Sequence, residues 1–125
     1  MREAGWGRIV LLSGALAWRP FPGFGVYAAM KAGATAFART LALEEGASGI
    51  TVNTIALGRI EHDDGGKAFS PHPGYEALDE VTRRRVALPR MASPQDVAET
   101  VRYLVSPQAV AVTGQVIFLA AGEPM

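Results

Sequence analysis

The chain has 125 residues, 49% of them hydrophobic and 19% charged, and these values fit one ordinary globular domain. Its 12 Lys and Arg balance its 12 Asp and Glu, which argues against a protein that binds nucleic acid or anionic membranes. The chain has no cysteine, which excludes thiol catalysis, cysteine-based zinc sites and disulfides, and which fits a cytoplasmic protein. No apolar run is long enough for a transmembrane helix, and the early Glu3 and Ser13-Gly14 argue against a secretory signal.

Three segments in the first half of the chain have clear local patterns. The apolar run Arg8–Ser13, bounded by glycines, predicts a buried strand. A loop with two Pro and two Gly follows it, and Val26–Glu45, without Pro and rich in Ala and Leu, predicts a long helix. The β-branched run Ile50–Ala56 predicts a second strand.

The amino-acid composition changes after the second predicted strand. Leu57–Pro73 holds several Gly and Pro, both histidines and many charges, and predicts a long surface loop of the kind that covers binding sites. Tyr75–Val86 predicts a short polar helix. Ser93-Pro94-Gln95-Asp96 predicts a capping box that opens another helix, and Gly114–Ala121 predicts a third strand. The apolar face expected for the capped helix comprises Val97, Ala98, Val101, Leu104 and Val105.

Strands that are apolar on both faces and alternate with helices are typical of a parallel α/β sheet covered on each side. The sequence therefore predicts three parallel strands at Arg8–Ser13, Ile50–Ala56 and Gln115–Ala120. The long helix between the first two strands implies a right-handed crossover.

Tyr27 and Lys31 are the first candidates for chemistry. Four residues apart on the predicted long helix, they share one face. A lysine ammonium near a phenol favours the phenolate and lowers the tyrosine pKa, so that the phenol can exchange a proton with a carbonyl or alcohol. Taken alone the pair is weak, because a packed tyrosine beside a solvated lysine has the same spacing.

The surroundings of the pair give it more weight. GRIVLLS, YAAMKAG, GITVN, RMASPQDVAETVRYLVS and TGQVIFLAAG occur in this order. In these motifs the chain resembles the C-terminal, catalytic half of the short-chain dehydrogenase/reductase family over essentially its whole length. The resemblance implies a partial Rossmann-like, doubly wound parallel sheet made of the last three family strands with flanking helices. Residues 1–125 would form one domain, and the dinucleotide-binding half would be absent from it.

The resemblance also implies an activity and a set of site residues. The activity is NAD- or NADP-dependent reduction of a carbonyl or oxidation of an alcohol. Tyr27 would be the general acid and base, and Lys31 would lower its pKa and bind the nicotinamide ribose. Both would contact the cofactor, and Gly58 and the backbone of Ile60 would approach the nicotinamide ring.

The chain departs from the family pattern at several places. No three glycines have the Gly-x-x-x-Gly-x-Gly spacing of the phosphate-binding turn, which with the catalytic Asn would lie before Met1, so this chain alone is expected to bind NAD(P) weakly or not at all. Gly14 stands where the family has its catalytic Ser, and the neighbouring Ser13 is expected to face away unless the strand bulges. Leu57-Gly58 replaces Pro-Gly, and His62 replaces a Thr.

Two readings remain open at this point. One is an active oxidoreductase with a small-molecule carbonyl or alcohol substrate, without nucleic-acid or membrane partners. The other is a catalytically impaired, truncated remnant or a non-catalytic partner subunit. The Ala-rich face of the long helix fits either a homo-oligomer contact or packing on its own sheet. His62, Asp63, Asp64 and His72 have no metal-site spacing, so no metal is expected, and the sequence names neither the substrate nor the choice between NAD and NADP.

Overall fold

The computed structural model describes residues 1–61 and 74–125, and its elements follow the predicted order. Most of the loop predicted at 57–73 lies outside the described residues. The strands and helices are β1 (Gly7–Gly14), α1 (Gly25–Glu45), β2 (Ile50–Leu57), α2 (Tyr75–Arg83), α3 (Pro94–Leu104) and β3 (Val116–Leu119).

The three strands form one parallel sheet in the order β1-β2-β3, which confirms the predicted arrangement. β1 pairs with β2 along its whole length, from Gly7 opposite Ile50 to Gly14 opposite Leu57. The register is continuous, so β1 has no bulge at Gly14. β3 is shorter than predicted and pairs with only the second half of β2.

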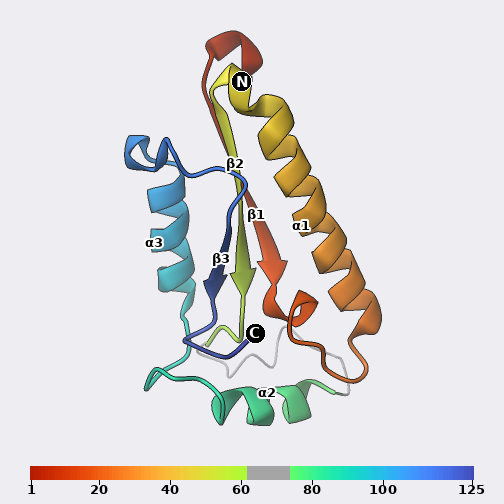
Figure 1. Cartoon of the computed structure of the whole chain (residues 1–125). Helices are drawn as coiled ribbons and strands as arrows, with labels where there is room; N and C mark the ends of the chain where they lie inside the picture. The colour runs from red at the N-terminus through yellow and green to blue at the C-terminus, as the bar shows by residue number, and fades with distance from the viewer. Residues whose placement is uncertain (62–73) are drawn as a thin grey trace.

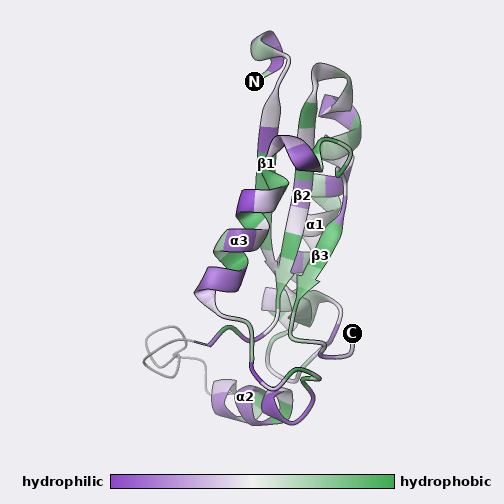
Figure 2. Cartoon of the chain, turned by 90° about the vertical axis from the view of Figure 1, so that its left-hand side faces the viewer, coloured by the Kyte–Doolittle hydropathy of each residue, from purple (hydrophilic) through white to green (hydrophobic). Residues whose placement is uncertain are grey.

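Helices cover the sheet on both faces (Figures 1 and 2). α1 lies along one face and α3 along the other, while α2 crosses below the carboxyl ends of the strands, where the C-terminus also lies. Ala38 and Ala42 of α1 pack on Ile50 and Val52 of β2. These two alanines of α1 therefore pack on its own sheet, whereas Ala29, Ala32 and Ala36 are exposed. None of the described helices has the length and apolar character needed to cross a membrane.

A clamp of hydrogen bonds fixes the segment before β3 against β2. The Asn53 side chain donates to the Val112 carbonyl at 2.7 Å and accepts from the Gln115 N–H at 3.1 Å. The Gly114 N–H donates to the Val52 carbonyl at 2.7 Å, and Gly114 has the positive φ of 68° that favours glycine. These contacts between Val52-Asn53 of β2 and Thr113-Gly114-Gln115 thus bring β3 beside β2.

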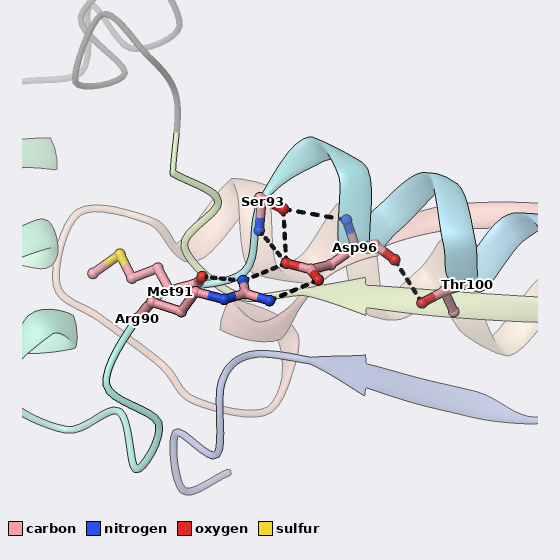
Figure 3. A network of polar contacts seen from close by, with 5 residues as sticks. All are labelled: Arg90, Met91, Ser93, Asp96 and Thr100. Carbon is pink, nitrogen blue, oxygen red and sulfur yellow. Dashed lines mark hydrogen bonds and ion pairs between the residues drawn. The ribbon is translucent and has the colours of Figure 1, made fainter.

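The predicted capping box opens α3 (Figure 3). The Asp96 N–H donates to the Ser93 hydroxyl at 3.3 Å, and the Asp96 carboxylate accepts from the Ser93 N–H at 2.8 Å. Arg90 donates to both oxygens of the same carboxylate. These hydrogen bonds, with that from Arg90 the largest, hold the pKa of Asp96 well below its usual range.

The apolar face predicted for α3 is only partly correct. Leu104 is fully buried and Val97 and Val101 are half-buried, but Ala98 is exposed and Val105 is 39% exposed. α3 packs on the rest of the chain through a narrow apolar stripe, and Ala98 and Val105, at the edge of this stripe, remain exposed to solvent. α2 also ends earlier than predicted, at Arg83.

Candidate active site

A cavity of about 490 Å³ lies at the carboxyl ends of β1 and β2, bounded by the start of α1 and by α2. In open parallel α/β sheets this edge is where ligands bind, and the volume suits a small molecule. All four residues named from the sequence line it, namely Tyr27, Lys31, Gly58 and Ile60. The described residues that line it are Leu12, Ser13, Ala15, Leu16, Arg19, Phe24, Tyr27, Lys31, Leu57, Gly58, Arg59, Ile60, Tyr75, Leu78, Thr82 and Glu123.

Tyr27 and Lys31 share one face of α1, as their spacing predicts. The Lys31 ammonium lies 5.6 Å from the centre of the Tyr27 ring, in a cation–π arrangement. The ammonium donates a hydrogen bond to the Leu12 carbonyl of β1, at 3.1 Å. This bond ties α1 to the end of β1 and holds the ammonium over the ring face instead of at the phenol oxygen.

The expected lowering of the Tyr27 pKa is wrong for this structure. Tyr27 is 42% exposed, and the burial of the rest of the side chain raises the pKa of its phenol above the ordinary value. Because the Lys31 ammonium is directed to the Leu12 carbonyl, it does not offset this effect. The phenol is therefore protonated at neutral pH.

Gly14 faces the Tyr27 phenol. A Cβ added at Gly14 would lie 2.5 Å from the Tyr27 hydroxyl oxygen, so a larger residue there requires the phenol to shift. Ser13 faces the other way, as expected. It is buried, its hydroxyl donates to the Lys31 carbonyl at 3.1 Å, and it accepts from the Thr35 hydroxyl at 3.1 Å. Ser13 thus fastens β1 to α1.

Gly58 and Ile60 form the part of the cavity wall that follows β2. The Gly58 N–H donates to the Leu119 carbonyl at 3.0 Å, and a Cβ on Gly58 would lie 2.8 Å from Ala120, so glycine permits close packing on β3. Ile60 forms an isolated parallel bridge with Ala92. The backbone after β2 is therefore held from both sides, although the family's proline is missing.

Two ion pairs at the cavity were not predicted from the sequence. Arg59 pairs with Asp79 of α2 and lies 5.1 Å from the centre of the Tyr75 ring. Burial alone would raise the pKa of Asp79, but hydrogen bonds from Arg83 and Arg59 outweigh it and lower this pKa.

The second unpredicted pair joins Arg19, in the loop after β1, to Glu123 near the C-terminus at 2.7 Å. The sequence offered one indication that Arg19 has a specific role, because it is the single charged residue in an otherwise apolar, Pro-rich loop. Its partner could not be found by spacing, because the two residues come from opposite ends of the chain.

The histidine and aspartate group considered for a metal, His62, Asp63, Asp64 and His72, lies outside the described residues. Within residues 1–61 and 74–125, no cluster of three His, Cys, Asp or Glu side chains could hold a metal ion.

Comparison with known proteins agrees with this geometry. The family model described as enoyl-(acyl carrier protein) reductase matches residues 1–123. The hydroxynaphthalene reductase-like protein Arp2 of Metarhizium acridum is 35% identical over an alignment of 128 positions, which covers 94% of this chain and 47% of that protein. The (2S)-[(R)-hydroxy(phenyl)methyl]succinyl-CoA dehydrogenase subunit BbsC of Thauera aromatica is 32% identical over 123 residues, which cover 98% of this chain and 45% of the subunit.

Among solved structures, a short-chain type dehydrogenase/reductase from Mycobacterium ulcerans superposes with a TM-score of 0.85 at 31% identity, covering 98% of this chain and 43% of that one. This likeness confirms the partial Rossmann-like fold. The chain spans less than half the length of these relatives. With the family model matching nearly every residue, the chain belongs to the short-chain dehydrogenase/reductase family of oxidoreductases.

Proposed function

We propose that the protein reduces a carbonyl group, or oxidises an alcohol, with NAD or NADP, and that Tyr27 exchanges the proton. The observation that carries the proposal is the position of the Tyr27 phenol, which lines the cavity at the carboxyl edge of the sheet together with Lys31. Because the chain spans less than half of its relatives, the proposal concerns the whole protein in which these residues form the catalytic part.

The protonation state of Tyr27 favours the reductive direction. A phenol that is protonated at neutral pH is ready to donate its proton to the oxygen of a carbonyl bound in the cavity. A bound NAD(P)H supplies the hydride for the carbonyl carbon. In the opposite direction the phenol must first lose its proton. Since burial raises the pKa of Tyr27, alcohol oxidation should speed up as the pH rises toward that pKa, and carbonyl reduction should not.

The residues present fit the nicotinamide side of such a cofactor. The Lys31 ammonium carries three N–H donors, of which the Leu12 carbonyl takes one, so donors remain for ribose hydroxyls. Gly58 and Ile60 would pack against the nicotinamide ring. The sequence has no glycine-rich phosphate turn, so residues 1–125 alone are expected to bind NADH and NADPH weakly or not at all. Micromolar affinity in titration calorimetry would contradict this expectation.

The experiment for the proposal replaces one tyrosine at a time. Tyr27→Phe removes the proton donor and should lower kcat by roughly 10²–10⁴-fold. Tyr103→Phe is the matched control, because Tyr103 is a half-exposed tyrosine of α3 outside the cavity lining. Both variants are assayed by following NAD(P)H consumption with a panel of ketones. Equal rates for wild type and Tyr27→Phe would overturn the role of Tyr27.

Lys31 is tested through the cofactor. Lys31→Ala should raise the KM for NAD(P)H, since it removes the donors offered to the ribose, and Lys31→Arg should restore part of the affinity because it returns a cation of similar reach. A KM for NAD(P)H that is the same in all three proteins would contradict the role given to Lys31.

A second candidate function, a catalytically impaired partner subunit, is supported by two observations. Gly14 brings no hydroxyl to the Tyr27 phenol, and one relative, BbsC, is named as a dehydrogenase subunit. Gly14→Ser separates the two functions. In an impaired subunit it should create activity that the wild type lacks, provided that the Tyr27 phenol shifts to admit the serine Cβ, which would otherwise lie 2.5 Å from the phenol oxygen. Turnover by the wild type alone would overturn this candidate. Three expectations from the sequence accompany the first proposal and remain predictions. They are a small-molecule substrate, a homo-oligomer and a cytoplasmic location.

A further inference from the structure

α2 forms one wall of the candidate active site. Tyr75, Leu78 and Thr82 of α2 line the cavity, and their spacing of three and four residues places them on one side of the helix. α2 crosses below the carboxyl ends of the strands, whereas α1 and α3 lie along the faces of the sheet (Figure 1). The position of this wall therefore depends on contacts from the segments that follow the strands.

Two arginines from these segments hold α2. Arg59, which follows β2, pairs with Asp79 and lies 5.1 Å from the centre of the Tyr75 ring. Arg19, in the loop after β1, donates from Nη2 to the Thr82 hydroxyl at 3.1 Å. One arginine thus holds the first part of the helix, and the other holds its last turn.

Glu123 allows Arg19 to be buried at this place. Arg19 is 8% exposed and Glu123 is 5% exposed, and Arg19 Nε lies 2.7 Å from Glu123 Oε1. A guanidinium so far from water costs free energy unless an opposite charge lies beside it. The planar, forked head group of Arg19 therefore serves two partners, with one nitrogen at its counter-charge and another at α2.

The turn that carries Glu123 is bound to the segment after α2. The Ala121 carbonyl accepts from the N–H groups of Ala87 at 2.9 Å and Leu88 at 3.1 Å. Ala121 has a φ of 52°, in the left-handed region that residues other than glycine rarely adopt. Such a conformation persists where its surroundings fix it. The C-terminal segment, Arg19 and α2 thus form one connected unit beside the cavity.

We propose that Arg19 is a positioning residue, which holds α2 in place so that the cavity-lining side of this helix contacts the part of the substrate distant from Tyr27. Glu123 serves as its counter-charge. This inference rests on the proposed function and deepens it. The substrate is then a carbonyl compound, or the matching alcohol, whose apolar part extends from the reacting carbon to Tyr75 and Leu78.

The first test measures α2 without a ligand, by hydrogen exchange and mass spectrometry. Thr82→Val removes the hydroxyl that accepts from Arg19. The α2 amides should then exchange roughly ten- to hundredfold faster, the value of one hydrogen bond to a charged group, while the α1 amides keep their rate. Thr82→Ser keeps the hydroxyl and should behave like the wild type. Thr100→Val, in α3 and outside the cavity lining, is the matched control. Unchanged α2 exchange in Thr82→Val would overturn the inference.

Arg19→Lys tests the arginine itself. Lysine keeps a positive charge beside Glu123, but its one nitrogen replaces two that serve different partners. The α2 amides should therefore exchange faster by a factor similar to that of Thr82→Val. The double variant should add little to either change, because both break the same interaction. Factors that multiply in the double variant would show that Arg19 and Thr82 act separately and would contradict the inference.

The second test compares cyclohexanone with 4-phenylcyclohexanone, which adds an apolar group to the same carbonyl ring. Thr82→Val and Arg19→Lys should raise the KM for the phenyl ketone several-fold. This factor should exceed both the rise in KM for cyclohexanone and the fall in kcat, because Tyr27 and Lys31 belong to α1. Thr82→Ser should restore the KM. A merely structural role would change both ketones by equal factors, and that result would overturn the inference.

A binding measurement separates this inference from the proposed function. If neither ketone is turned over with NADH or NADPH, the proposed function fails, and ligand-observed NMR without cofactor still decides the inference. Stronger saturation transfer to 4-phenylcyclohexanol than to cyclohexanol, weakened in Thr82→Val and kept in Thr82→Ser, supports it. Equal transfer to both alcohols, or equal transfer in wild type and Thr82→Val, overturns it.

Discussion

β1 and β2 have the same length and pair residue by residue, but they differ sharply in burial. Leu12 of β1 and Ile55 of β2 lie directly opposite each other on one face of the sheet. Ile55 is 0% exposed, whereas Leu12 is 47% exposed. β2 lies between two strands, while no described strand pairs with the outer edge of β1.

The difference shows that the position in the sheet, and not the local sequence, determines how far an apolar strand residue is buried, and burial in turn sets how much the residue can stabilise the fold. The run of β1 is apolar and that of β2 is rich in β-branched residues, and both look like buried strands when read alone. At their carboxyl ends the two strands become alike again, because Ser13 and Ala56, which lie opposite each other, are both buried. The cavity therefore lies at an end of β1 that includes a buried residue, Ser13, in its lining.

The largest expected effect comes from truncating the opposed pair. Ile55→Ala should lower the free energy of unfolding by about 2–5 kcal/mol, because the fully buried side chain leaves a cavity. Leu12→Ala should cost less than about 1 kcal/mol, because half of the Leu12 side chain is already in water. Urea unfolding followed by circular dichroism measures both. Similar losses would mean that the outer edge of β1 is covered in solution.

Two neighbouring polar residues of β2 are equally buried, but we expect their replacement by apolar residues to change the stability in opposite directions. Asn53 and Thr54 are both 1% exposed, but the Asn53 side chain makes two hydrogen bonds, while the Thr54 hydroxyl has no partner among the described residues. Asn53→Leu should destabilise the protein by about 1–3 kcal/mol, since it strands the Gln115 N–H and the Val112 carbonyl.

Thr54→Val keeps the shape and removes an unpaired hydroxyl, so it should stabilise the protein by up to about 1 kcal/mol. The same urea series measures it. A destabilised Thr54→Val protein would show that the hydroxyl has a partner in solution, such as bound water.

Ser13 provides the corresponding test in β1. Ser13→Ala removes the hydrogen bond to the Lys31 carbonyl and should cost about 1 kcal/mol, because the single Thr35 O–H, which Ser13 and that carbonyl share, can then donate to the carbonyl alone at 2.9 Å. Ketone reduction should change little, because the Ser13 hydroxyl is directed under α1 and away from the Tyr27 phenol. A loss of activity as large as that of Tyr27→Phe would mean that β1 rearranges at Gly14 when substrate binds.

The elements of the fold could be predicted because each has a local cause. Glycines bound the run that forms β1, and Ser93 with Pro94 and Asp96 specifies the start of α3 through contacts within four residues. The parallel order followed from the long α1 crossover. The exposure of Leu12 did not follow, because it depends on which strands lie beside β1 in space.

The candidate site was predicted in its residues but not in its electrostatics. The spacing of Tyr27 and Lys31 places both on one face of α1, but it does not show that the Leu12 carbonyl takes a hydrogen bond from the ammonium. The sign of the Tyr27 pKa shift was therefore wrong. The pair of Arg19 and Glu123 depends on how the loop after β1 folds over the strand ends, which no local pattern reports.

The smallest expected effect concerns α3, which covers the sheet face opposite α1 and thus the Leu12 and Ile55 side. Arg90 first, and then Ser93, hold the pKa of Asp96 well below its usual range (Figure 3). A carboxylate with a lower pKa in the folded state stabilises the protein above its unfolded pKa of about 4 and loses this contribution as the pH falls toward the folded value. The urea midpoint of the wild type should therefore fall more steeply below about pH 4 than that of Asp96→Asn. Arg90→Gln, which removes the strongest of these interactions, should give an intermediate slope. Added salt should narrow the difference, because the Arg90 side chain is 60% exposed. Parallel pH curves for wild type and Asp96→Asn would show that the cap contributes nothing through its charge, and that α3 is held by Leu104 and its other apolar contacts alone.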